Sequence, residues 1–364
     1  MALEPCPLKS FCDPFISYTG NPQPIVTPCG PRKAVTTWKV KFLVSNINDL
    51  ATNYDPDLID PWGLVIFNNR LWVVSDGSDI ISVYDLYGNR QGTFIDLRDN
   101  YQNVSFATGL IVNSDTGFPV TNGLVTRPAL FLTATEHGEV LAYNPFVDPG
   151  KTYVVLNQQI TGEIMEYRGL AIANNTLYLA DFFRGRIDVF DNNYNRLLGF
   201  NFIDNDLSDP IPVDFAPNNI VHIGCNLFVL YARRDPNVPL EEIHGPGNGY
   251  ISVFNYDGSF VRRFTSRGVL NSPWAMIPAP CECGFPPGSF LVGNTGDGRI
   301  NVFDYNGRYV GPLLNQAGLP IVIEGLWGLA PHYGDFSQIF FTASPNPNTD
   351  GILGVLVRDQ TIFI

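Results

Sequence analysis

Hydrophobic and polar positions along the chain follow a pattern that recurs six times. In each copy a short run of alternating apolar residues, usually after a glycine turn, ends in an aromatic residue and a carboxylate or amide. The copies lie at residues 80–85, 138–144, 185–191, 249–255 and 298–304, with a degenerate sixth at 351–356. Alternation with a period of two predicts β-strands, and recurrence at such a spacing predicts a repeat architecture.

Two further apolar segments precede each copy. The first begins beside a small or aromatic residue, as in Pro61-Trp62-Gly63, and the second lies at 71–74, 130–133, 177–180, 227–231, 290–293 and 339–342. After several copies, a turn that opens with Asp or Asn and closes with Gly leads to a fourth segment, at 91–95, 261–265 and 309–313. Four short strands with their turns need about 40–50 residues, the length of one propeller blade. The pattern predicts an all-β fold, a six-bladed β-propeller.

One strand-like segment has no partner within the six units. Residues 38–44 precede the first unit, while the sixth unit ends soon after residue 357. We expect residues 38–44 to complete the sixth blade as its outer strand, because a closed ring leaves only short, protected edges. Residues 361–364 are the alternative for that place. Residues 1–35 are rich in proline and cysteine and predict an extended arm, so the expected domains are 1–35 (arm) and 36–364 (propeller).

Composition narrows the function classes. Hydrophobic residues make up 45% of the chain, charged residues 16%, and the formal net charge is −13. A chain with this much negative charge is not expected to bind nucleic acid or an anionic membrane surface. No apolar run is long enough for a transmembrane segment, and the N-terminus lacks the pattern of a signal peptide. We expect an intracellular protein or one incorporated in a particle, unless the sequence is the mature form of a secreted protein.

Several stretches resemble an uncharacterised family of NHL-type six-bladed β-propeller proteins, whose bacterial members are commonly exported and associated with PEP-CTERM sorting tails. The resemblance covers about residues 40–357 and rests on the segments 55–58, 61–64, 168–173, 179–191, 245–249, 291–304, 325–329 and 341–346. It implies the propeller fold and no particular activity. The chain departs from the family in lacking a signal peptide and a sorting segment and in carrying the arm. A protein of a particle or envelope, attached through that arm, fits these departures equally well.

Polar residues follow the second strand of several units. If the blades bring them together, Asp76, Glu136, Asp181 and Asn294 offer the hard oxygen ligands that Ca²⁺ or Mg²⁺ prefers. Hydrolases of the six-bladed lactonase type use such a ring of carboxylates and amides. The competing interpretation is that these residues cap the turns between the second and third strands. No catalytic residue is assigned.

A second set of candidates should lie near the ring axis, where first strands begin or second strands end. These channel or binding residues are Trp62, Arg168, Asn218, Asn219, Arg233, Trp274 and Trp327. Trp and Arg are favoured at recognition sites, although large rings can also simply fill the centre of the ring. A buried Arg168 needs a partner, for which Asp181 or Glu166 is expected.

The longest connection between a second and a third strand, residues 232–249, is interpreted as a rim loop or lid. Cys6, Cys12, Cys29, Cys281 and Cys283 are candidates for disulfides or for attachment of the arm, whereas Cys225 is expected to be a turn or core thiol. The preferred function is a non-enzymatic binding or structural module whose partners are other proteins, bound through loop 232–249 and arm 1–35. The alternative is a Ca²⁺- or Mg²⁺-dependent hydrolase or lyase of the lactonase type.

Overall fold

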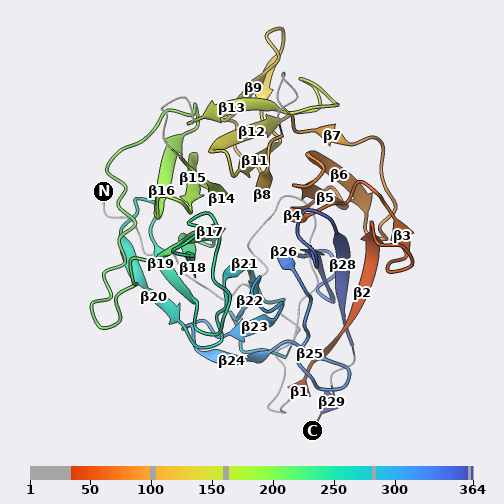
Figure 1. The fold of residues 1–364 in the computed structure, drawn as a ribbon, viewed down its shortest axis with the longest axis vertical. Helices are drawn as coiled ribbons and strands as arrows, with labels where there is room; N and C mark the ends of the chain where they lie inside the picture. Colours follow the sequence, from red (N-terminus) through yellow and green to blue (C-terminus); the bar gives the residue numbers. More distant parts are fainter. Residues whose placement is uncertain (1–33, 99–103, 159–163, 281–283, 360–361, 364) are drawn as a thin grey trace.

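The protein is an all-β propeller of six blades (Figure 1). The computed structural model describes residues 34–98, 104–158, 164–280, 284–359 and 362–363, and within these ranges it contains no helix. The blades follow one another around a common centre, each an antiparallel sheet with its first strand innermost. This confirms the fold class predicted from the repeated pattern.

The strands of each blade are given from the centre outward. Blade one contains β4 (Pro61–Phe67), β5 (Arg70–Ser75), β6 (Ile80–Asp85) and β7 (Ile95–Asp96); blade two contains β8 (Ala107–Val112), β11 (Phe131–Thr135), β12 (Glu139–Tyr143) and β13 (Tyr153–Asn157). Blade three contains β14 (Tyr167–Ala173), β15 (Thr176–Asp181) and β16 (Arg186–Asp191); blade four contains β17 (Phe215–Ile223), β18 (Asn226–Arg233), β19 (Gly249–Phe254) and β20 (Phe260–Ser266). Blade five contains β21 (Pro273–Pro278), β22 (Phe290–Asn294), β23 (Ile300–Phe303) and β24 (Tyr309–Pro312).

Blade six is closed by the N-terminal strand. Its sheet consists of β26 (Leu326–Pro331), β27 (Gln338–Ala343), β28 (Ile352–Arg358) and β2 (Thr37–Ser45). The antiparallel pairing of β2 with β28 runs from Trp38 opposite Arg358 to Ser45 opposite Ile352. The predicted closure is therefore confirmed. The alternative segment pairs elsewhere, since β29 (Ile362–Phe363) pairs with β1 (Ala34–Val35).

Additional short strands lie outside the four-stranded pattern of the blades. A hairpin of β9 (Pro119–Thr121) and β10 (Thr126–Pro128) extends from blade two, and β3 (Asn53–Tyr54) and β25 (Leu314–Asn315) pair in parallel with β2. Apart from β1, the predicted arm lies outside the described residues. Its separation from the propeller therefore stays a prediction.

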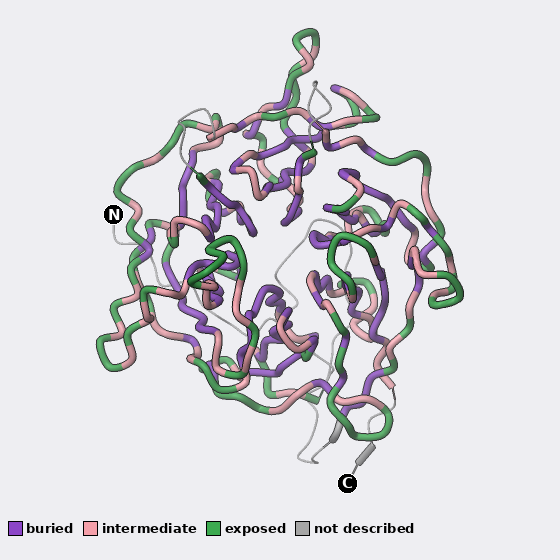
Figure 2. Tube along the Cα trace, in the orientation of Figure 1, coloured by how far each residue is buried: buried purple, intermediate pink, exposed green. Residues whose placement is uncertain are grey.

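The aromatic residue of the repeated pattern lies between blades. Tyr84, Tyr143, Phe190, Phe254 and Phe303 are all buried, at most 4% exposed. The carboxylate that follows organises the next turn: Asp85 Oδ1 accepts hydrogen bonds from the N–H groups of Tyr87 and Asn89, both at 2.9 Å. The repeated pattern thus builds the scaffold, and Figure 2 shows the buried strands inside a rim of exposed loops.

First strands of neighbouring blades contact each other all the way around the centre. A Cβ atom on Gly169 would lie 1.9 Å from Oδ1 of Asn219, so glycine permits this close approach. Side chains also join the blades: Thr108 donates to the Tyr167 carbonyl at 2.8 Å and Thr342 to the Trp62 carbonyl at 2.8 Å. The inner ring is therefore held by packing and by hydrogen bonds that cross from blade to blade.

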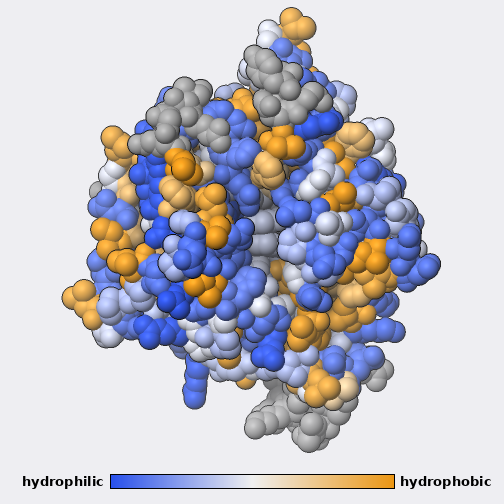
Figure 3. Space-filling model, in the orientation of Figure 1, coloured by the Kyte–Doolittle hydropathy of each residue, from blue (hydrophilic) through white to orange (hydrophobic). Residues whose placement is uncertain are grey.

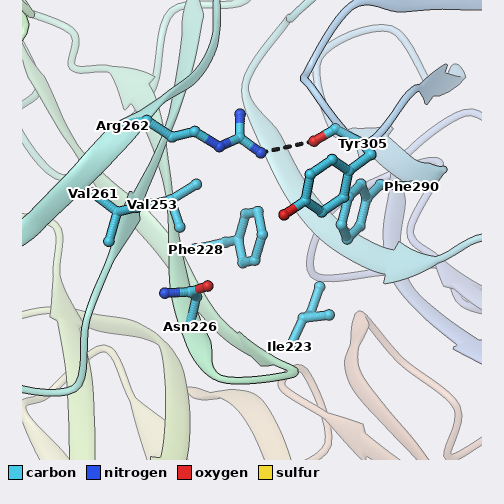
Figure 4. Close-up of a pocket in the computed structure, with 8 residues that line it drawn as sticks. All are labelled: Ile223, Asn226, Phe228, Val253, Val261, Arg262, Phe290 and Tyr305. Atoms are coloured by element: carbon cyan, nitrogen blue, oxygen red, sulfur yellow. Dashed lines mark hydrogen bonds between the residues drawn. The ribbon is translucent and has the colours of Figure 1, made fainter. Parts of the chain in front are cut away.

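A small crevice lies between blades four and five, away from the ring centre (Figure 4). Its volume is about 50 Å³, and the Arg262 guanidinium crosses it to donate to the Tyr305 carbonyl at 2.7 Å. Nearby, at the turn between β17 and β18, Cys225 is disulfide-bonded. Cys225 therefore lies at a turn, as expected, but it is part of a disulfide, and the expectation of a thiol was wrong. The other five cysteines lie outside the described residues, so their predicted roles stay predictions.

Candidate functional site on the upper face of the ring

Neighbouring strands of a blade run in opposite directions. The start of each first strand and the end of each second strand therefore lie at the same face of the ring. We call this the upper face. It carries the connections between second and third strands and those that lead into each first strand. The lower face carries the hairpin turns, such as the one at Tyr87 and Gly88. Every candidate metal ligand and every candidate binding residue lies at or near the upper face.

Three tryptophans from first strands pack together on the upper face. The rings of Trp62 and Trp327 stack with centroids 3.5 Å apart and an interplanar angle of 15°. Trp274 packs edge-on against both, at 6.3 Å from Trp62 and 5.7 Å from Trp327. The Trp62 indole N–H donates to Asp60 Oδ1 at 3.1 Å, which fixes its ring. These rings join blades one, five and six.

Arg168 is the centre of a buried network. Its guanidinium lies 3.8 Å above the Phe182 ring and donates to Glu166 Oε1 at 2.6 Å and to Glu242 Oε2. Burial acts to lower the pKa of Arg168, but the charges of Glu242 and Glu166 raise it overall. Burial raises the pKa of Glu166 although Arg168 opposes it, whereas Arg168 and His244 overcome burial and lower the pKa of Glu242 to about 2. One cation therefore serves two carboxylates, one of which was the expected Glu166.

The insertion in blade four, residues 234–248, is fixed over this network. Arg168 donates to the Leu240 carbonyl at 2.5 Å, and Ile243 N–H donates to the Arg233 carbonyl at 2.8 Å. The Gly245 N–H donates to Asn271 Oδ1 at 2.6 Å. Glu242 was not predicted, because a loop that folds back on another blade leaves no periodic signal in the sequence.

A second group of carboxylates lies beside the tryptophans. Asp76 N–H donates to the Asp60 carbonyl at 2.9 Å, which places the two residues side by side. Burial, followed by the charges of Glu136, Asp60 and Asp79, raises the pKa of Asp76 to about 8. Burial also raises the pKa of Glu136 to about 7, with Arg168 opposing. The charge of Glu136 therefore acts on Asp76, and a shared metal site for these residues stays a prediction.

The other two predicted metal ligands have local partners. Asp181 Oδ1 accepts from the Arg184 N–H at 3.0 Å, and the Asn294 amide donates to the Val269 carbonyl at 2.8 Å and to Asp297 at 3.1 Å. Burial raises the pKa of Asp181 to about 6. Both residues bond within their own turns, yet Oδ2 of Asp181 and Oδ1 of Asn294 are buried without a hydrogen-bond partner. Throughout the described ranges, no three His, Cys, Asp or Glu residues are arranged to hold a metal ion.

The remaining candidate residues bond to neighbouring segments of the propeller. Asn218 and Asn219 donate to the carbonyls of Pro273 and Trp274, at 3.1 and 2.8 Å, and so tie blade four to blade five. Arg233 pairs with Asp214 at 2.7 Å on the rim. Asp60 was not a candidate, and no pattern in the sequence distinguishes it from an ordinary turn aspartate.

Solved structures with the same architecture have little sequence in common with this chain. A Bacteroides thetaiotaomicron protein of unknown function matches 89% of this chain and 76% of its own, with a TM-score of 0.57 and 12% identity. The calcium-binding protein regucalcin from Agrobacterium tumefaciens covers 90% of this chain and 97% of its own (TM-score 0.51, 12% identity). A streptogramin B lyase covers 88% and 98% (TM-score 0.50, 13% identity). At such identities the likeness concerns the fold alone.

No family model matches the sequence. Two proteins of Acanthamoeba polyphaga mimivirus match almost its whole length. Uncharacterized protein L690 is 62% identical over 99% of this chain and 96% of its own length. Uncharacterized protein R648 is 60% identical over 99% of this chain and 90% of its own length. The chain therefore belongs to the same family as the mimivirus proteins L690 and R648.

Proposed function

We propose that the propeller is a non-enzymatic binding module that takes a partner protein on its upper face. The observation that carries the proposal is the fixed insertion, residues 234–248, tied to blade three by Arg168. Long loops held on a rigid scaffold are typical binding elements. A loop already ordered by internal bonds loses little entropy when a partner binds.

Exposed apolar side chains surround this insertion. Val238 and Leu240 on the insertion are 50% and 44% exposed, and Val213 and Ile164 on neighbouring connections are 93% and 61% exposed. We call these four residues the apolar rim. Figure 3 shows that hydrophobic groups stand out on a largely hydrophilic surface. Beside the insertion lies a hollow of about 230 Å³, lined by Pro246, Asp297 and Arg299 among others. Apolar groups framed by charged ones are common at protein interfaces.

Site-specific photo-cross-linking tests this proposal. A photoreactive phenylalanine analogue replaces Val238 on the insertion in one variant and Tyr87, 78% exposed in a lower-face turn, in a matched control. Both full-length chains are irradiated in their native setting. We expect a discrete cross-linked species from position 238 and none from position 87. Cross-links from position 87 alone would contradict the proposal.

The competing function is a hydrolase or lyase that depends on Ca²⁺ or Mg²⁺. The unpartnered buried oxygens of Asp76, Asp181 and Asn294 favour it. Against it, no three His, Cys, Asp or Glu residues of the described ranges are arranged to hold a metal ion. Turnover of lactone substrates by the purified chain tests it. A reaction that requires added Ca²⁺ or Mg²⁺ and is lost in Asp76→Asn would replace our proposal.

The described part of the chain holds no helix with the length and apolar character that a bilayer crossing needs. Assembly into a larger particle through residues 1–35 remains part of the proposal. Because the relatives L690 and R648 come from a virus, a role in a particle is consistent with the family.

A further inference from the structure

The hollow beside the insertion, about 230 Å³ in volume, lies between blades four and five. Blade four contributes Pro246 and Val269 to its lining, and β24 of blade five contributes Tyr309 and Pro312. Pro320, on the connection between blades five and six, adds a third proline. The volume is below the roughly 300–1,000 Å³ typical of sites that enclose a small-molecule ligand. A few residues of extended chain therefore fit this hollow better than a small molecule does.

Two exposed hydrogen-bond donors also line the hollow, the guanidinium of Arg299 and the phenol of Tyr309. Within the part of the chain that the structure describes, Arg299 has no ion-pair partner and the Tyr309 hydroxyl has no hydrogen-bond partner. A polyproline segment makes no internal hydrogen bonds, so its carbonyl groups accept bonds from outside. The hollow thus combines apolar contacts with free donors that suit the backbone of such a segment.

Exposed apolar side chains border the hollow. Val310 follows Tyr309 on β24, Leu319 precedes Pro320, and all three side chains of Val310, Leu319 and Val322 are exposed. Val322 lies opposite Arg299 in a β-bridge, so it too belongs to a segment that borders the hollow. Covering these side chains removes apolar surface from water and favours a docked segment.

The N-terminal arm is attached close to this hollow. Thr37, the first residue of β2, pairs with Leu314 of β25, and Leu314 in turn bridges to Pro320. Neighbouring strands lie about 4.8 Å apart, which puts Thr37 roughly 10 Å from Pro320. Because β2 and β25 run parallel, the chain that precedes Thr37 lies on the side of Pro312, which lines the hollow.

The sequence of the arm suits such a site. The part nearest its attachment carries prolines at positions 22, 24, 28 and 31. Proline-rich segments favour the extended polyproline conformation and lose little entropy on docking, because they are stiff beforehand. At ~3.1 Å per residue, residues 22–31 would span about 30 Å. That length is enough to reach the hollow from the start of β2 and to lie along it.

We propose that residues 22–31 of the arm dock in the hollow of the same chain. The lining prolines, Val269 and Tyr309 pack against the prolines of the arm, and Arg299 donates to its carbonyl groups. Because the arm is tethered beside the hollow, its effective concentration is high and weak contacts are sufficient. The inference goes beyond the proposed function, since a partner can bind at the insertion whether or not the arm docks. Residues 1–21 extend beyond the docked segment and stay available for attachment to a particle.

Photo-cross-linking within the purified full-length protein tests this inference. A photoreactive phenylalanine analogue replaces Tyr309 in the hollow in one variant and Phe146, 80% exposed on blade two, in a matched control. Blade two lies across the ring from blade five (Figure 1). After reduction, trypsin releases residues 10–32 of the arm as one peptide, because it cleaves after Lys9 and Arg32. We expect mass spectrometry to find this peptide attached to position 309 and not to position 146.

Two further variants, each carrying the analogue at position 309, locate the docked part of the arm. Replacing every proline in 22–31 by alanine should lower the yield of the cross-link about tenfold or more, because the stiffness and the apolar contacts are lost. Replacing every proline in 5–14 by alanine is the control, and it should leave the yield unchanged because these residues lie beyond the docked segment.

Irradiating a mixture of isotope-labelled and unlabelled chains distinguishes docking within one chain from exchange between copies. We expect the arm peptide and the peptide that contains position 309 to carry the same isotope. A product of mixed isotopes would overturn the inference in favour of a second copy. The inference would also be overturned if position 309 captured no arm peptide, if positions 309 and 146 captured it equally, or if the 22–31 variant kept its full yield.

Discussion

At the scale of single residues, two buried carboxylates of the candidate site differ sharply in pKa. Glu242 is held ionised by Arg168, with a pKa of about 2, while burial raises the pKa of Asp76 to about 8. The sequence predicted Asp76 and Glu136 because polar residues recur after each second strand. It named Glu166 only as one of two possible partners of Arg168, and it could not predict Asp60 or Glu242, since their places depend on how turns from different blades meet in space.

The first prediction concerns pH and stability. The folded-state pKa of Asp76 lies above its unfolded value of 3.8, so the contribution of this group to stability is fully present below about pH 4 and is lost as pH rises toward 8. Asp76→Asn removes that dependence. We expect the variant to gain on the wild type as pH rises, by at most about 1.4 kcal/mol per pH unit. Urea denaturation at a series of pH values measures the difference, and a gap that does not change with pH would refute the burial of Asp76.

At the scale of elements, the insertion of blade four and the inner strands define the upper face. The strand bounds predicted from the repeated pattern agree closely with the observed ones. The copy predicted at 80–85 is β6, and the second strand predicted at 177–180 is the centre of β15. The insertion could be located only as a gap between strands. Its path follows from one arginine of blade three, a contact between segments far apart in the sequence.

The second prediction tests that anchor. Arg168→Met leaves Glu166 and Glu242 buried without their cation, which should lower the free energy of unfolding by about 3–5 kcal/mol. Amide hydrogen exchange in residues 237–243 should also accelerate, because the Leu240 carbonyl loses its donor. Arg233→Met breaks a half-exposed pair with Asp214 and should cost at most about 1 kcal/mol. Equal costs for the two variants would mean that the network does not hold the insertion.

The third prediction concerns contact between the inner strands of blades three and four. In Gly169→Ala the new methyl group would meet Asn219 Oδ1 at 1.9 Å and its Cα at 2.9 Å, so the strands must separate. We expect destabilisation of about 1–3 kcal/mol, the usual cost of overpacking. Gly150→Ala is the control, because the nearest atom to its added Cβ lies at an ordinary 3.6 Å. Calorimetric melting of both proteins measures the difference. Equal melting temperatures would show that the close approach is not required.

At the scale of the whole molecule, the ring is one cooperative body closed by its first long strand. Trp38 and Val44 on β2 are fully buried in blade six, although they lie at the other end of the chain from β28. The sequence allowed this closure to be predicted, because residues 38–44 had no other partner. The sheet of blade three has three strands among the described residues, although the Asp191 turn is built as in the other blades, so the sequence pattern could not show that this sheet is incomplete.

The fourth prediction tests closure. A chain that begins at residue 47 lacks β2 and leaves the edge of β28 uncovered. A chain that begins at residue 34 keeps β2 paired with β28. We expect the shorter chain to aggregate or lose its cooperative melting transition, because an uncovered apolar edge is unstable in water. Size-exclusion chromatography and circular dichroism compare the two. A monomeric, cooperatively folded chain from residue 47 would contradict the role of β2.

The central claim is that the upper face binds a partner protein around the insertion that Arg168 anchors. It is tested most directly by photo-cross-linking from position 238 in the wild type and in the Arg168→Met variant, which loses the anchor of the insertion. The account predicts a cross-linked partner in the first and a loss of about tenfold or more in the second. Equal cross-linking in both, with the Arg168→Met variant still folded, would contradict it.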